Sequence, residues 1–475
     1  MLTQAPSRRR FLAQAGGGLG LLGLADLLHQ NGKLRAEPPS NALPTSLLAP
    51  KAGHFPAKAK SVIWLYMYGA PSGMDTFEYK PELQKRDGQV LPKPPDVLFG
   101  HPGPLMKSPF KFSQYGQNGT WVSELFPNVA KHVDELAFLR GCTADSNNHA
   151  PACMQMNTGV TRIGHPSAGA WVTYGLGSEN QNLPGFMVMY DHRSVPVAGT
   201  PNWGNGFLPA TYQGVTLRPT DTPLLYSQWD AKMTAERQRA QLDFLQSLNK
   251  DHRQHHDADT QSELDARIAS YELAYRMQMT APDVVNLQKE SQATKTLYGL
   301  DKETTKPFGT QLLIARRLVE QGVRFIQIYC GGTRLNWDAH QDLEKNHRQL
   351  CGETDLPIAG LLTDLRARGL LDSTLVVWGA EFGRMPISQD GNGRDHNPQG
   401  FLTWMCGGGT KPGTSYGRTD ELGHLAVEGK STVPDFHATM LHLLGLDHTR
   451  LTYFHNGRNM RLTDVSGRVI REILA

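Results

Sequence analysis

The stretch Thr374-Leu-Val-Val-Trp-Gly-Ala-Glu381-Phe-Gly-Arg384, followed by Gly393-Arg-Asp395-His396-Asn-Pro398, decides how this chain is interpreted. An apolar run with the length of a strand leads directly into a carboxylate, a glycine and then a histidine. In open α/β sheets, ligands bind just beyond the carboxyl ends of the strands. We therefore expect Glu381 and His396 at a site where Arg384 steadies an anion and Asp395 either ligates or orients His396.

Short apolar runs with few charges recur along the chain and alternate with amphipathic segments. Such runs are typical of central strands in a parallel sheet, and they cover residues 61–68, 136–139, 186–190, 323–329, 374–378 and 401–405. Leucines fall at helical spacing in segments 308–321 and 356–368. The alternation predicts an α/β fold with a mostly parallel central sheet.

The N-terminus resembles a twin-arginine export signal. Ser7-Arg8-Arg9-Arg10-Phe11-Leu12 begins a weakly hydrophobic run that is rich in Gly, Ala and Leu. Residues 1–36 are assigned to this signal segment, and residues 37–60, rich in Pro, Ala and Lys, to a linker. Export by this route predicts a periplasmic or extracellular protein. An uncleaved N-terminal anchor is the alternative, and no later segment is apolar and long enough to span a bilayer.

The folded domain is expected at residues 61–475, with a helical insertion at about 227–295. That insertion is strongly polar and nearly free of strand formers, which predicts one or two long exposed helices. It could serve as a lid or as a dimerisation arm, so an oligomer is possible.

Composition narrows the class of protein. The net charge is +3 and the basic residues are spread along the chain, so no basic patch indicates a nucleic-acid partner. Five cysteines without a C-x-x-C pair do not resemble a disulfide framework or a zinc ribbon. Most of them are expected to be buried.

Three further polar clusters are candidate ligand sources: Asp75 in the turn after the first strand, His149 before an apolar helix, and Asp338-Ala-His340 after a Gly-Gly turn. Capping alone would explain Asp75 and its neighbour Ser72, but it explains His149 less naturally. Ser72 or Thr76 could instead be a nucleophile. Carboxylates with imidazoles and no thiolates suit zinc, manganese, magnesium or calcium.

From Lys60 onward the chain resembles the DUF1501 family, on the segments 69–77, 147–159, 336–340, 381–384 and 393–398. That family is grouped with the alkaline phosphatase and sulfatase superfamily. The resemblance implies a three-layer α/β/α sandwich with a divalent metal centre at the strand ends.

By position, the resemblance places Glu381 on a metal-binding aspartate and Phe382 where asparagine or histidine would stand. His149 takes the place of the sulfatase nucleophile, and Cys153 stands where the sulfatase arginine would be, which argues against a formylglycine mechanism. Asp338-x-His340 resembles a metal pair, compressed in this chain, and His396 resembles a late histidine ligand.

Taken together, these features predict an exported metal-dependent hydrolase of phosphate or sulfate esters. The expected metal ligands are Asp75, Asp338, His340, Glu381 and His396. His149 is expected as nucleophile or ligand, with Arg384 holding an anionic small molecule or a sulfated or phosphorylated carbohydrate. The alternatives are a non-catalytic binding protein for such carbohydrates and a structural envelope protein.

Overall fold

The computed structural model describes residues 47–98, 101–218, 234–253, 258–389 and 391–475. The expected signal segment and most of the linker's first half lie outside the described residues, as do 227–233 and 254–257 of the expected insertion. The chain divides into two compact units. The smaller one is built around α7 (Ala235–Arg253) and most of α8 (Ala258–Val285), and the larger one holds most of the remaining described chain.

A nine-stranded sheet forms the centre of the larger unit. Its strands are β1 (Ser61–Met67), β4 (Leu136–Thr143), β5 (Phe186–Met189), β6 (Val215–Leu217), β7 (Phe325–Cys330), β8 (Thr374–Gly379), β11 (Phe401–Cys406), β12 (Ser415–Tyr416) and β15 (Ser431–Thr432). They lie in the order β12-β4-β11-β8-β1-β7-β5-β6, with β15 beside β4. All six predicted apolar runs are strands of this sheet.

Strand direction follows the prediction with one exception. β1 pairs in parallel with β7 and β8, and β5 does so with β6 and β7. β11 pairs antiparallel with both β8 and β4, so the interpretation of 401–405 as a parallel strand is wrong. Because β11 follows β8 closely in the chain, it can return beside it without a crossover helix.

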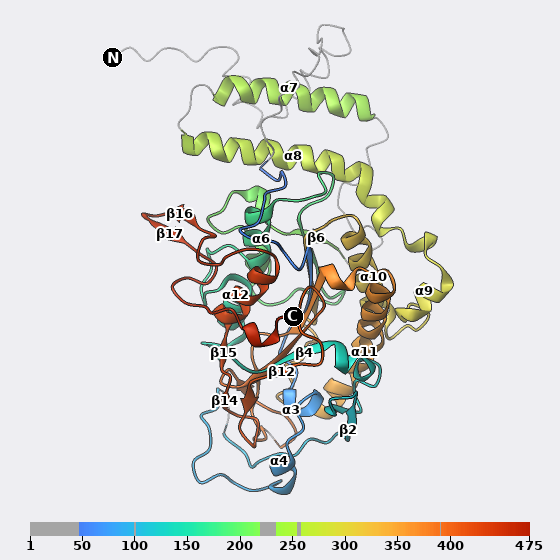
Figure 1. The fold of residues 1–475 in the computed structure, drawn as a ribbon, viewed down its shortest axis with the longest axis vertical. Coiled ribbons are helices and arrows are strands. Elements are labelled where there is room, and N and C mark those ends of the chain that lie inside the picture. The colour runs from blue at the N-terminus through green and yellow to red at the C-terminus, as the bar shows by residue number, and fades with distance from the viewer. Residues whose placement is uncertain (1–46, 99–100, 219–233, 254–257, 390) are drawn as a thin grey trace. The chain divides into compact units, whose positions relative to one another are not determined.

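Helices cover both faces of the sheet (Figure 1). α10 (Lys306–Glu320) and α11 (Leu343–Ala367) lie on one face, and α6 (Ala168–Leu176) and α12 (Val433–Leu443) on the other. The predicted three-layer sandwich is therefore confirmed. The shorter helices are α3 (Gly73–Thr76), α4 (Pro81–Lys85), α5 (His149–Thr158) and α9 (Gln292–Leu297), with 3-10 turns at Val129–Glu135, Thr200–Trp203, Ala210–Tyr212, Leu287–Lys289, Leu371–Ser373 and Arg471–Ile473.

Small antiparallel ribbons lie outside the main sheet. They pair β2 (Phe112–Tyr115) with β3 (Thr120–Ser123), β9 (Gly383–Arg384) with β10 (His396–Asn397), β13 (Arg418–Thr419) with β14 (Ala426–Glu428), and β16 (Tyr453–His455) with β17 (Arg458–Met460). The β9–β10 ribbon matters most, because its register sets His396 opposite Arg384.

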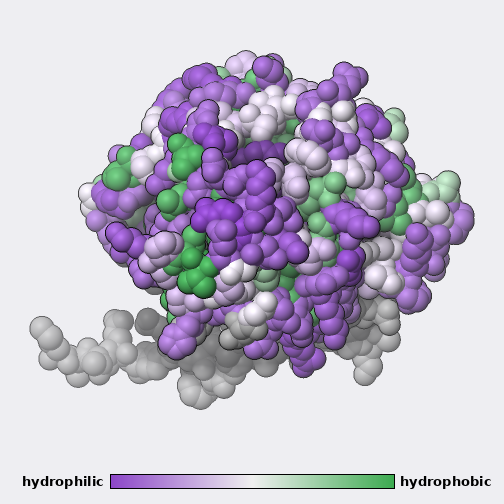
Figure 2. All heavy atoms as spheres, turned by 90° about the horizontal axis from the view of Figure 1, so that it is seen from below, coloured by the Kyte–Doolittle hydropathy of each residue, from purple (hydrophilic) through white to green (hydrophobic). Residues whose placement is uncertain are grey.

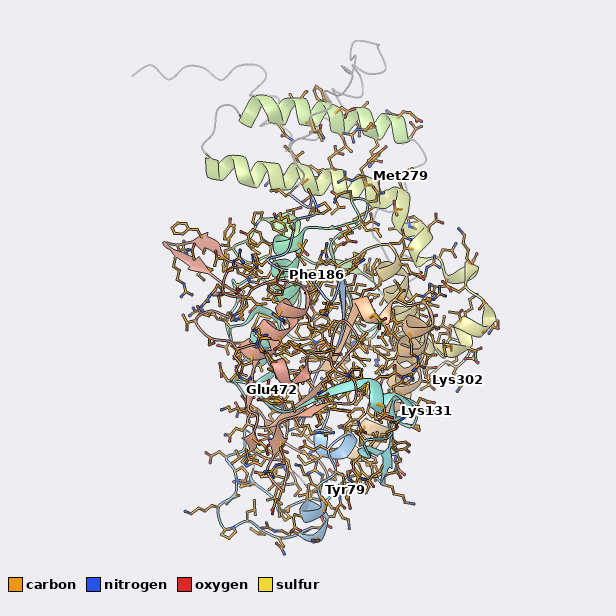
Figure 3. The ribbon with its side chains drawn as sticks, in the orientation of Figure 1. Tyr79, Lys131, Phe186, Met279, Lys302 and Glu472 are labelled. Atoms are coloured by element: carbon orange, nitrogen blue, oxygen red, sulfur yellow. The ribbon has the colours of Figure 1, made fainter. Side chains whose placement is uncertain are left out.

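The core of the larger unit is rich in buried aromatic side chains, and its central strands are covered on both faces. Every residue of β1 is buried. Trp378 of β8 and Trp404 of β11 are paired in register, with ring centroids 6.0 Å apart and planes 1° from parallel. Phe186 of β5, labelled in Figure 3, lies in the same interior. All five cysteines are free thiols and buried, as expected for most of them.

The insertion is helical where it is described. α7 and α8 are held together by Arg239, whose Nη1 and Nη2 donate to the Glu272 carboxylate at 2.8 and 2.7 Å. Among the described residues, no helix combines the length and the apolar character that crossing a membrane requires.

α3 and α4 follow the carboxyl end of β1 and lie at one end of the larger unit (Figure 1). Seen from that end, the surface is mainly hydrophilic, with separate hydrophobic patches (Figure 2). Polar ligands approaching the strand ends therefore meet a largely polar surface.

Candidate metal centre

The loops that follow β1, β7 and β8 meet at one place in the larger unit. The Gly69 N–H, just after β1, donates to Oε1 of Glu381, just after β8, at 2.9 Å. A Cβ added to Gly69 would lie 2.6 Å from the backbone nitrogen of Asp338, in the loop after β7. Gly69 also has a φ of +101°, so only glycine allows this approach without strain.

A second glycine brings in the loop that carries His396. A Cβ on Gly393 would lie 1.8 Å from the carbonyl oxygen of His340. The next residue, Arg394, donates its backbone N–H to Ala339 O at 3.0 Å. The loop before β10 is therefore fixed against the Asp338–His340 turn by its main chain.

His149 enters this site as the first residue of α5. Asn148 caps the helix by accepting the Ala150 N–H at 3.2 Å, which confirms the predicted helix start. The His149 Nδ1 lies 2.6 Å from Oε1 of Glu381, and its Nε2 lies 3.1 Å from Oδ2 of Asp338. Among the described residues, that Nε2 has no partner aligned for a hydrogen bond.

Two more imidazoles face the same carboxylate. Asp338 Oδ1 lies 2.9 Å from Nε2 of His340 and 3.0 Å from Nε2 of His396. These two nitrogens are themselves 3.0 Å apart. On the far side of each ring, Nδ1 of His340 contacts Gln389 Oε1, and Nδ1 of His396 lies 2.6 Å from the Asn147 carbonyl oxygen.

The acceptors that contact Nδ1 of the three histidine rings determine which ring nitrogen carries the hydrogen. Glu381, Gln389 and the Asn147 carbonyl can only accept at these contacts, so each ring places its N–H on Nδ1. A neutral ring then presents a lone pair on Nε2. Three lone pairs and the Asp338 carboxylate therefore face one another, an arrangement that requires either an extra proton on the rings or a cation between them.

The spacing of these atoms fits a cation. Ligands held about 2.1 Å from a zinc-sized ion lie roughly 3.0–3.4 Å from one another. The separations of 2.9–3.1 Å between these atoms lie at or just below the lower end of that range. Two groups of side chains are close enough to bind an ion: His149 with Asp338 and His396, and His340 with Asp395 and His396.

Without an ion, the carboxylate is satisfied by protons. Burial alone would raise the pKa of Asp338, but the Arg384 guanidinium and the three histidines outweigh it and lower that pKa. Burial lowers the pKa of His149 and His340, yet their contacts with Asp338 raise both above the ordinary value. Burial, followed by Arg384 and His149, lowers the pKa of His396 to about 4. His396 is thus neutral at pH 7 and able to ligate.

Two expected ligands lie outside both groups. Asp75 is fully buried and its Oδ2 accepts from Nε of Arg394 at 2.7 Å and from the Ser72 hydroxyl at 2.5 Å. Glu381 is also fully buried and lies behind His149. Of the five expected metal ligands, the structure thus brings Asp338, His340 and His396 together, and it adds His149.

Each guanidinium nitrogen of Arg384 already has a partner within the protein. Its nitrogens donate to the carbonyl oxygens of Ala70 at 2.9 Å and Arg394 at 3.0 Å, and also to Gly69 O. Its Nη2 lies 2.7 Å from Asp338 Oδ1. Arg384 therefore secures the turn after β1 and neutralises Asp338, and this geometry does not support the expected contact with an anion.

The candidate protein nucleophiles are buried. Ser72 and Thr76 are shielded from solvent, and burial raises the pKa of the Cys153 thiol well above its ordinary value. His347 of α11 is also fully buried, and its Nε2 accepts the Ser72 N–H at 3.1 Å.

Sequence reasoning missed the residues that support the imidazoles. Gln389 and the Asn147 carbonyl hold His340 and His396, and Phe382 packs on both His149 and His396 at 4.8 and 4.7 Å between ring centroids. Tyr68 packs on His149 at 5.7 Å. Asn147 and Phe382 lie in segments that carry the family resemblance, so the sequence offered a signal for them. Gln389 lies outside those segments, and the sequence offered no signal for it.

Over residues 59–474 the chain matches the family described as "Protein of unknown function (DUF1501)". The chain belongs to the DUF1501 family. None of the curated proteins matches the sequence significantly.

The chain is also similar to solved structures of alkaline phosphatase-like and sulfatase-like enzymes. The lipoteichoic acid synthase LtaP from Listeria monocytogenes is 10% identical with a TM-score of 0.36, over 90% of this chain and 80% of that one. The PsFucS1 sulfatase from Pseudoalteromonas sp. is 10% identical with a TM-score of 0.34, over 94% and 75%. The alkaline phosphatase from the Antarctic bacterium TAB5 is 8% identical with a TM-score of 0.32, over 75% and 94%.

Proposed function

We propose that this protein is an exported metal-dependent hydrolase of phosphate or sulfate esters. One observation carries the proposal: Nε2 of His149, His340 and His396 all face the Asp338 carboxylate, while the Nδ1 of each ring is engaged by an acceptor behind it. This orientation prepares the imidazoles to bind a metal ion, and without one the rings have to carry an extra proton that faces Asp338.

In this proposal His149, Asp338 and His396 hold a divalent ion, and His340 with Asp395 offers a second position that shares His396. When bound, the ion supplies Lewis acidity and lowers the pKa of coordinated water toward about 7. Glu381 keeps His149 in the tautomer that presents Nε2. Phe382, 1% exposed, excludes water from one side of the His149 and His396 rings.

The residue set favours oxygen- and nitrogen-ligated divalent ions: zinc, manganese, magnesium or calcium. Three imidazoles place zinc ahead of manganese, calcium and magnesium, which prefer oxygen ligands. The substrate would be an anionic small molecule or a sulfated or phosphorylated carbohydrate, reached after export by the twin-arginine route.

The burial of the candidate nucleophiles supports a second candidate function. Ser72, Thr76 and Cys153 are buried, and the Nε2 of His149 faces Asp338 within the proposed metal site. A chain without an accessible protein nucleophile can bind an ester without cleaving it. The second candidate is therefore a non-catalytic, metal-containing binding protein for the same anionic carbohydrates.

Metal content and turnover separate the two candidates. Full-length protein is purified, its metal is measured by plasma mass spectrometry, and aryl phosphate and aryl sulfate panels are assayed. His396→Ala is the test variant. Glu472→Gln is the control, because Glu472, labelled in Figure 3, is exposed and its ion pair among the described residues is with Arg468.

We expect stoichiometric metal and ester turnover in the wild type and in Glu472→Gln, and loss of both in His396→Ala. Metal without turnover of either ester class would favour the binding protein. Protein that takes up none of zinc, manganese, magnesium and calcium after dialysis against each ion would refute both candidates. A chelator should lower the melting temperature of the metal-loaded protein and leave His396→Ala unchanged.

A further inference from the structure

The buried pair of Asp75 and Arg394 lies directly behind the metal centre. Both side chains are fully buried, and Nε of Arg394 lies 2.7 Å from Oδ2 of Asp75. The same carboxylate oxygen accepts from the Ser72 hydroxyl, and Oδ1 lies 3.3 Å from Nη2 of Arg394. Both oxygens of Asp75 therefore face Arg394.

Arg394 joins three segments of the site through its main chain and side chain. Its backbone N–H donates to Ala339 O at 3.0 Å, between Asp338 and His340. Its carbonyl oxygen accepts from Nη1 of Arg384 at 3.0 Å. Its guanidinium also donates to the carbonyl oxygens of Met106 at 2.9 Å and Met385 at 3.3 Å.

The residues after Arg394 transmit this position to the ligand. Asp395 Oδ1 accepts the backbone N–H of His396 at 2.8 Å, and its Oδ2 accepts the Leu98 N–H at 2.6 Å. A displacement of Arg394 would therefore move the backbone of His396 and the turn that holds Asp338 at the same time.

Charge makes the pair interdependent. Burial alone raises the pKa of the Asp75 carboxyl, but the nearby Arg394 guanidinium outweighs it, so that pKa is lowered and Asp75 is ionised at neutral pH. An arginine cannot release its proton to become neutral. Without Asp75, the guanidinium would remain as an uncompensated buried charge and would leave its present position or draw in water.

We propose that Asp75 is a positioning residue, which acts through Arg394 to hold His396 and the Asp338–His340 turn in register, and that it is not a ligand of the metal. This inference rests on the proposed metal centre. The sequence suggested Asp75 as a metal ligand, whereas this inference makes it a residue that positions the ligands.

A double-mutant cycle on metal affinity tests the role of Asp75. Zinc dissociation constants are measured by competition with a chromophoric chelator for wild type, Asp75→Asn, Arg394→Met and the double variant. Asp283→Asn is the matched control, because Asp283 is 78% exposed and pairs only with Lys289 among the described residues. Circular dichroism on each sample gives the folded fraction used to correct the constants.

If Asp75 acts through Arg394, each single variant binds zinc about 10–100-fold more weakly, as for other residues that orient ligands. The double variant is then no weaker than the weaker single variant. Asp283→Asn matches the wild type. Multiplying effects, which would place the double variant about 10–100-fold beyond either single variant, would show that Asp75 contributes independently and would overturn the inference.

A spectroscopic readout covers the case in which Arg394→Met does not fold. Cobalt is loaded into wild type and Asp75→Asn, and the visible absorption bands are compared at saturation. Unchanged band positions with weaker affinity support positioning, whereas shifted bands and a changed intensity identify Asp75 as a ligand. If the wild type binds neither zinc nor cobalt, the proposed metal centre fails first, and that outcome is distinct from either result of the cycle.

Discussion

Replacing Glu381 with glutamine tests the link between the buried carboxylate and His149. Glu381 is fully buried, and its Oε1 accepts from Nδ1 of His149 at 2.6 Å and from the Gly69 N–H at 2.9 Å. Glutamine keeps the volume and one acceptor but loses the negative charge, so the basicity of His149 falls. Loss of such a partner weakens metal binding about 10–100-fold, or roughly 1.4–2.7 kcal/mol.

The same change has a calculable effect on stability. Zinc at about 100 times its dissociation constant stabilises the native wild type by about 2.7 kcal/mol. After a roughly 30-fold loss of affinity, the same concentration is about three times the new constant and stabilises by only about 0.8 kcal/mol. We therefore expect Glu381→Gln to lose about 2 kcal/mol of zinc-dependent stability.

Urea unfolding with and without zinc measures this quantity directly. Glu472→Gln removes the same charge from an exposed position and should keep the full zinc-dependent gain. A Glu381→Gln protein that gains as much stability from zinc as the wild type would show that Glu381 does not support His149. A complete loss of zinc binding would instead indicate that Glu381 is itself a ligand.

Two further predictions follow from packing and burial. Gly393→Ala would place a Cβ 1.8 Å from His340 O, so we expect a loss of about 1–3 kcal/mol in urea unfolding together with weaker zinc binding. Gly352→Ala, in α11 with no atom within 4 Å, should instead gain up to about 1 kcal/mol, and equal effects of the two changes would contradict this account. Burial lowers the pKa of His437 to about 4, so its contribution to stability is complete above its ordinary pKa and is lost as pH falls through the window between the two values. At pH 4 the loss is ~3 kcal/mol, and unfolding measured at pH 7, 5 and 4 should show a shallower decline in His437→Gln, which keeps a donor for Met156 O.

The fold was largely predictable because buried strands carry a strong local signal. Each long strand of the main sheet is a nearly uninterrupted apolar run, and the predicted bounds of β1 and β8 differ from the observed ones by one residue. Direction was not predictable for β11, since an apolar run is the same whether its strand is parallel or antiparallel. The short strands β6, β12 and β15, of two or three residues each, were also missed, because too few residues carry the pattern.

Several residues of the candidate site were predictable, but the contacts between its residues were not. Strand-end loops and residue chemistry pointed to Asp338, His340 and His396, which the structure brings within 3.0 Å of one another. The pairing of Asp75 with Arg394 joins positions 319 residues apart, and local spacing carries no information about it. Both residues look like ligand or anion-binding groups until their burial and mutual charge are known.

The five unpaired, buried thiols bear on how the chain can mature. No covalent cross-link has to form before the native state is reached, so folding requires neither an oxidant nor a disulfide isomerase. The protein can therefore acquire its tertiary structure in a reducing compartment and tolerate a later move to an oxidising one, because its sulfur atoms are shielded from reagents in both.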